Sequence, residues 1–93
     1  MNKFSLGRVV MTAGVHQKCE EDMNFQAFVN DSVQRYIHCD WGELCAEDKK
    51  LNDDAVKNGD ERILAEYRNK SYRIWIITEW DRSATTILFP EEY

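Results

Sequence analysis

The spacing of apolar residues changes from helical to strand-like after residue 62 of this 93-residue chain, and that change limits the folds open to it. Between residues 25 and 37 the apolar side chains recur every three or four positions, which is the period of one helix face. The residues of this face are Phe25, Phe28, Val29, Val33, Tyr36 and Ile37. After residue 62 the pattern changes to short runs rich in β-branched and aromatic residues, which are typical of strands. The sequence therefore predicts an α+β protein.

The first two thirds of the chain are predicted to hold one strand and two or three helices. The expected elements are a strand at 4–12, a short helical turn at 15–19, a central helix over the periodic residues that is ended by Asp40-Trp41-Gly42, and a helix at 43–58. Asp22 or Asn24 is expected to cap the central helix, because short polar side chains accept hydrogen bonds from the free N–H groups at a helix start. Gly59 is expected to end the last helix.

The last third is predicted to form a three-stranded antiparallel meander. Its strands are expected at 62–68, 72–78 and 84–89. A turn at Asn69-Lys70 would join the first two as a hairpin, and Pro90 would end the third. The helices are expected to pack on one face of this sheet. With no linker or repeat in the sequence, residues 1–93 are expected to form a single domain.

The middle strand of the meander is apolar on both faces. Ile74 and Ile76 alternate with Trp75 and Ile77, so both sides of the strand need cover or a partner. Trp75 and Ile77 are therefore a candidate apolar interface, including that of a homodimer. The alternative is that the N-terminal segment covers this face.

The negative charge of the chain is concentrated in one stretch. Nine of the 17 carboxylates but only four of the 12 cations lie between Asp40 and Glu66, so this stretch carries the whole net charge of −5. Phosphate binding depends on clustered lysine and arginine, so direct binding of nucleic acid is disfavoured. A protein partner with a basic surface fits this charge better.

The acidic residues of this stretch are the candidate partner-binding residues. They are Asp40, Glu43, Glu47, Asp48, Asp53, Asp54, Asp60 and Glu61. Carboxylates spaced along a rigid helix can stand in for the phosphates of DNA in the basic groove of a nucleic-acid-binding protein. The simpler interpretation is a solvated helix face.

No motif for catalysis, metal or cofactor is recognisable, so no catalytic residue, metal or cofactor is assigned and the chain is expected not to be an enzyme. The four glycines stand singly, and the three cysteines have no C-x-x-C spacing. The alternative is a small metal-dependent or thiol enzyme that uses Glu79, Asp81 or the His38-Cys39 pair. A chain with no signal-like or membrane-spanning apolar run is expected in the cytoplasm, away from membranes.

The sequence resembles a family of small proteins of plasmids, phages and integrative elements, usually described as plasmid-related. The resemblance is carried by the run from Ile74 to Tyr93, with shorter matches at Asp40-Trp41-Gly42-Glu43-Leu44 and at Arg62-Ile63-Leu64. The chain departs from the family pattern at Ala13, where the family has proline, and at Cys39, where it has glycine. Residues 15–35 match least.

This resemblance implies an accessory protein of a mobile genetic element. Such elements commonly carry small acidic inhibitors of CRISPR effectors or restriction enzymes, so an anti-CRISPR or anti-restriction DNA mimic is the expected function. An accessory factor in plasmid replication or transfer is the alternative within the same class. The family assigns no catalytic residue to this chain.

Overall fold

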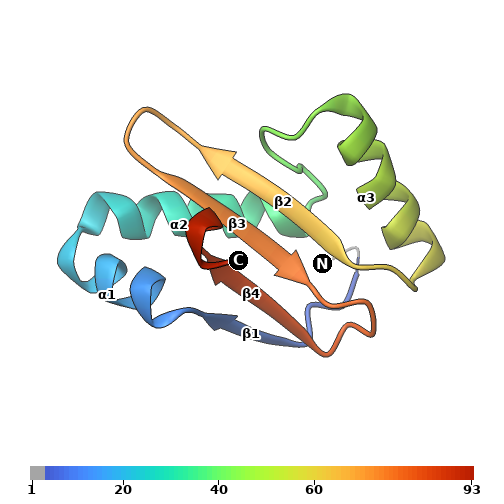
Figure 1. The fold of residues 1–93 in the computed structure, drawn as a ribbon, viewed down its shortest axis with the longest axis horizontal. Coiled ribbons are helices and arrows are strands. Elements are labelled where there is room, and N and C mark those ends of the chain that lie inside the picture. Colours follow the sequence, from blue (N-terminus) through green and yellow to red (C-terminus); the bar gives the residue numbers. More distant parts are fainter. Residues whose placement is uncertain (1–3) are drawn as a thin grey trace.

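The computed structural model describes residues 4–93 and has the expected α+β fold. Its elements in chain order are β1 (Arg8–Met11), α1 (Ala13–Glu21), α2 (Met23–Ile37), α3 (Ala46–Asn58), β2 (Ile63–Arg68), β3 (Arg73–Thr78), β4 (Ala84–Leu88) and a 3₁₀ turn, η1 (Pro90–Glu92). The strands form one sheet, with α2 behind it, α1 beyond the end of β1 and α3 beside β2 (Figure 1).

The sheet is mixed and has four strands in the order β1-β4-β3-β2. β2, β3 and β4 are antiparallel neighbours, as predicted for a meander. The prediction of a purely three-stranded antiparallel sheet is wrong, because β1 adds to β4 in parallel, from Arg8 opposite Ala84 to Met11 opposite Ile87. The residue pattern of β1 indicates a strand, but the partner lies far along the chain and no local turn specifies the pairing.

Hydrogen-bonded caps set where the first two helices begin. Thr12 Oγ1 accepts the Val15 N–H at 3.2 Å, so α1 is a full helix rather than the predicted short turn. Asp22 Oδ1 accepts the N–H groups of Asn24 and Phe25 at 3.0 and 3.1 Å, which identifies Asp22 as the cap of α2. α2 then places Phe25, Val29 and Tyr36 in the core, as its spacing predicted.

A chain of buried hydroxyl groups crosses the core beneath the sheet. The Tyr36 hydroxyl lies 2.6 Å from Thr78 Oγ1, which lies 2.8 Å from Thr85 Oγ1, and Thr85 donates to the Leu6 carbonyl at 2.7 Å. Burial raises the pKa of Tyr36, so this hydroxyl stays neutral. Because every member has a partner, the chain ties α2 to β3, β4 and the segment before β1.

The helices do not all pack on the same face of the sheet. α2 lies behind it, as predicted, but α1 lies beyond the end of β1 and α3 runs beside the outer edge of β2 (Figure 1). The opposite face is covered in part by η1 and the C-terminal Tyr93, whose ring makes an edge contact with Trp75 at 5.5 Å between centroids.

Candidate protein-binding surface

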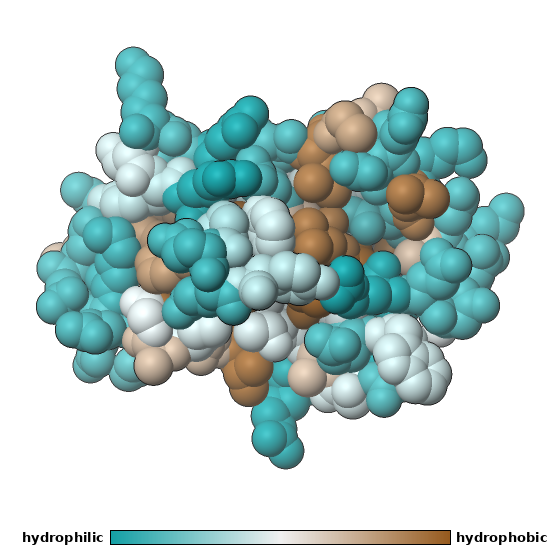
Figure 2. All heavy atoms as spheres, viewed as in Figure 1, coloured by the Kyte–Doolittle hydropathy of each residue, from teal (hydrophilic) through white to brown (hydrophobic). Residues whose placement is uncertain are grey.

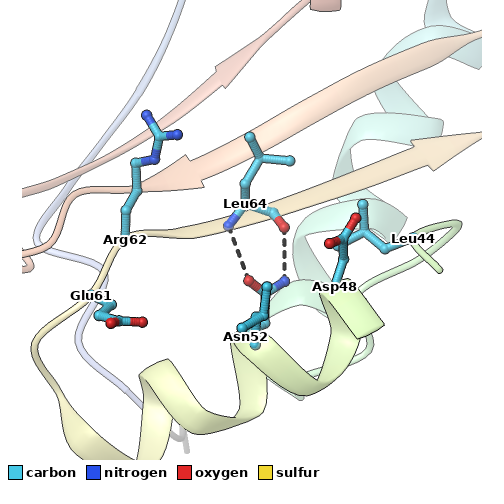
Figure 3. Close-up of a pocket in the computed structure, with 7 residues that line it drawn as sticks. Leu44, Asp48, Asn52, Glu61, Arg62 and Leu64 are labelled. Carbon is cyan, nitrogen blue, oxygen red and sulfur yellow. Dashed lines mark hydrogen bonds between the residues drawn. The ribbon is translucent and has the colours of Figure 1, made fainter. Parts of the chain in front are cut away.

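One side chain fastens α3 to the edge of the sheet. Asn52, at the middle of α3, donates its amide N–H to the Leu64 carbonyl at 2.8 Å and accepts the Leu64 N–H at 3.4 Å (Figure 3). The two contacts imitate the pairing that a further strand would supply, and Asn52 is 6% exposed. The amide therefore closes the outer edge of β2 at this position.

The loop before α3 closes the next part of the same edge. Gly42 makes a parallel bridge with Glu66, and the Glu43 N–H donates to the Glu66 carbonyl at 2.8 Å. The Glu43 carboxylate then accepts the Arg68 N–H at 3.1 Å. Glu43, a predicted partner-binding residue, is thus used in the structure of the sheet edge, and α3 begins only at Ala46.

Two further predicted partner-binding residues, Asp40 and Asp53, also make hydrogen bonds within the chain. Arg35 donates to both oxygens of Asp40, at 2.8 and 3.2 Å, and Asp40 Oδ1 also accepts the Gly42 N–H. The Arg35 hydrogen bonds hold the pKa of the Asp40 carboxyl below its usual value. Asp53 accepts the Trp41 indole N–H at 2.9 Å. Both carboxylates therefore position the turn that leads into α3.

The other predicted acidic residues face solvent. Asp54 makes only a long, exposed pair with Lys50, at 3.4 Å. Glu47, Asp48, Asp60 and Glu61 are exposed, and their carboxylates pair with no side chain or backbone group of residues 4–93. We call these four residues the acidic rim, because Asp48 and Glu61 border the groove described next.

A groove of about 340 Å³ lies between α3 and β2. Its lining residues are Leu44, Asp48, Leu51, Asn52, Glu61, Arg62 and Leu64. Figure 3 shows Asp48 and Leu44 at one end and Glu61 and Arg62 at the other, and Figure 2 shows apolar side chains exposed over β2 and toward α3. The groove combines a partly apolar lining with two unpaired carboxylates at its border, which matches the arrangement of an apolar centre with a polar rim at protein interfaces.

Sequence analysis missed this groove. Leu44 and Leu51 both line the groove; Leu44 is half-buried and packs against the core, whereas Leu51 is 59% exposed. The buried residues of α3 are instead Asn52 and Ala55. The thin apolar stripe of the helix was the available signal that part of its surface stays open.

The predicted apolar interface at Trp75 and Ile77 is largely covered within the chain. Ile77 is 4% exposed, and Trp75 is half-buried beneath Tyr93. The Trp75 indole donates to Glu66, which also pairs with Arg73, both at 2.9 Å. Burial opposes the ionisation of Glu66, but these hydrogen bonds outweigh it, so the pKa of Glu66 is lowered.

The residues of the alternative enzyme come from two segments, the end of α2 and the turn between β3 and β4. Across residues 4–93, no three His, Cys, Asp or Glu side chains come together in a group that could hold a metal ion. His38 Nδ1 lies 2.7 Å from the Gln34 carbonyl, and Cys19, Cys39 and Cys45 form no disulfide. Asp81 accepts the Ser83 N–H at 3.0 Å within a turn. No helix within residues 4–93 is long and apolar enough to cross a membrane.

Comparisons with known proteins give no relative for this chain. No family model, no curated protein and no solved structure matches it.

Proposed function

We propose that the chain is a non-enzymatic accessory protein of a mobile genetic element that binds a protein partner through the acidic rim and the adjoining groove. The observation that supports this most directly is that the carboxylates of Glu47, Asp48, Asp60 and Glu61 pair with no group of residues 4–93. Structural carboxylates such as Asp40 and Glu43 are paired in this fold. Glu47 and Asp48 lie in the first turn of α3, where their charge also favours the helix, and Asp48 and Glu61 border the groove with their carboxylates open to a partner.

The chemistry of this surface favours a basic partner that also offers an apolar side chain. Lysine or arginine of the partner would meet the acidic rim, and an apolar side chain would enter the groove against Leu51 and Leu64. DNA mimicry is the more specific form of the proposal: the rim would occupy the basic groove of a CRISPR effector or restriction enzyme. The resemblance to mobile-element proteins supports this form.

A pull-down with two matched variants tests the proposal. The rim variant replaces Glu47, Asp48, Asp60 and Glu61 by lysine. The control variant replaces the same number of exposed carboxylates elsewhere, Glu20, Glu21, Asp31 and Glu91, by lysine, so both variants have the same net charge. Each tagged protein is incubated with lysate of a bacterium that contains CRISPR and restriction systems, and retained proteins are identified by mass spectrometry.

We expect the wild type and the control variant to retain one specific protein that the rim variant loses. Partial release at raised salt is expected, because screening weakens exposed charge pairs but not apolar contacts. A CRISPR or restriction protein among the retained species would support the DNA-mimic form. If the rim and control variants lose the partner equally, net charge rather than this surface is responsible and the proposal fails.

A further inference from the structure

The two outer edges of the sheet differ in whether other segments of the chain cover them. β2 is closed by Asn52 and Glu43, whereas β1 ends the strand order and no segment within residues 4–93 pairs with its outer side. The side chains of Val9, Val10 and Met11 are 49%, 37% and 38% exposed. In Figure 1, β1 forms the lower border of the sheet with no helix or loop beyond it. An uncovered apolar edge strand is a ready template for another strand.

The backbone bonds of β1 identify which groups point outward. The N–H groups of Arg8 and Thr12 donate to the carbonyls of Ser83 and Ile87, both at 3.0 Å, so these residues face β4. Successive residues of a strand alternate in direction, which makes Val10 face β4 as well. The N–H and C=O groups of Val9 and Met11 therefore point away from the sheet.

We propose that β1 pairs antiparallel with β1 of a second copy of this chain, around a twofold axis at Val10. In that register Val9 lies opposite Met11 of the second copy, and Met11 lies opposite its Val9. Each of these is a hydrogen-bonded pair that exchanges two backbone bonds, so the outward groups of both copies are satisfied together. The edge is thus complementary to itself, and the two sheets become one continuous sheet of eight strands.

The side chains of β1 fit the same register. The two Val10 side chains meet in the close, non-hydrogen-bonded position at the axis, which suits β-branched residues. Arg8 lies opposite Thr12 of the second copy and not opposite a second Arg8, so no like charges meet. β1 is only four residues long and carries one charge, Arg8, but it contains no lysine or proline of the kind by which edge strands avoid self-pairing.

The distribution of charge permits this association. The acidic residues lie at the β2 edge, three strand spacings from β1, which is about 14 Å. In the joined sheet the β2 edges of the two copies are seven strand spacings apart, about 33 Å, which is well beyond the Debye length of about 8 Å at physiological ionic strength, so their acidic surfaces repel only weakly. The proposal concerns the edge opposite to the acidic rim and is independent of the proposed function.

Sedimentation equilibrium from about 10 μM to about 1 mM tests the proposal. The expected result is a mass that rises with concentration from 11.0 kDa toward twice that value. Val10→Lys places two ammonium groups opposite each other and is expected to weaken the dimer about tenfold or more. Val10→Thr, the matched control, keeps a β-branched side chain without charge and is expected to dimerise.

Two measurements test whether β1 forms the interface of the dimer. Hydrogen exchange by NMR is expected to show concentration-dependent protection of the Val9 and Met11 amides. Val9→Pro removes one outward N–H and spares the pairing with β4, so it is expected to reduce association while circular dichroism stays native. A wild type that is monomeric at the highest concentration overturns the proposal, as does a dimer that Val10→Lys and Val9→Pro leave unchanged.

Discussion

The β2 edge and the β1 edge of the sheet show two ways in which one chain ends a β-sheet. At β2 a helix and a loop supply an amide, a backbone N–H and a carboxylate to the outward groups of Leu64, Glu66 and Arg68. At β1 nothing in the described chain does so. The difference shows that acidic residues near a sheet edge need not bind a partner, because Glu43 uses its backbone N–H and its carboxylate in hydrogen bonds to β2.

The largest expected effect comes from opening the β2 edge at Gly42. Its φ is +73°, and a Cβ there would overlap the Glu66 carbonyl oxygen. Gly42→Ala is expected to lower the free energy of unfolding by roughly 3 to 5 kcal/mol, because the loop can no longer approach β2. Urea unfolding measures this loss. Gly59→Ala is the control: its φ is +76° but nothing lies within 4 Å, so backbone strain alone should cost roughly 1 to 2 kcal/mol. Equal losses would contradict the role of close approach.

The next effect concerns the amide that fastens α3. Asn52→Leu would leave the N–H and C=O of Leu64 without partners in a half-buried position, at an expected cost of roughly 2 to 4 kcal/mol. Asn58→Leu on the exposed end of the same helix is expected to change stability by less than about 0.5 kcal/mol. Thermal or urea unfolding compares the two. A small loss for Asn52→Leu would mean that water replaces the amide at this edge.

Acid is expected to weaken the β2 edge through Asp40. Folding lowers the pKa of Asp40. The Asp40 carboxylate therefore makes its full contribution to the free energy of unfolding above the ordinary aspartate pKa of about 3.9, and this contribution is lost as the pH falls through the lowered pKa of the folded state. The carboxylate is half-exposed, so the contribution is expected to stay below about 1 kcal/mol. Stability measured between pH 7 and pH 2 should decline less steeply in Asp40→Asn than in the wild type. Identical slopes would show that Asp40 is not responsible.

The smallest effect is expected at the β1 edge. Val9→Thr changes a side chain that is 49% exposed, so the stability of the monomer should change by less than about 0.5 kcal/mol. Ile87→Thr, on the same sheet but 2% exposed, should cost roughly 2 to 3 kcal/mol. Urea unfolding at low micromolar concentration makes the comparison without self-association. A large loss for Val9→Thr would mean that β1 is more tightly packed than its exposure indicates.

Local patterns allowed most elements to be predicted. The spacing of Phe25, Val29 and Tyr36 identified α2, and the apolar runs identified the β2–β3 hairpin and β4. The candidate site was less predictable. Of the eight acidic residues, only the carboxylates of the acidic rim lack an internal partner in the described chain, and nothing local distinguishes Asp48 from Asp53. That distinction depends on Trp41, which reaches Asp53 only after the loop before α3 has folded onto β2.

The amino-acid sequence by itself determined the α+β class, the helical face of α2, the order of the strands along the chain and the position of the acidic stretch. These properties follow from periodicity and composition, which act over a few residues. The tertiary structure alone decided that β1 joins β4 in parallel, that α3 lies beside β2 and that the groove opens between them. Each of these depends on contacts between segments far apart in the sequence, which local preferences do not specify.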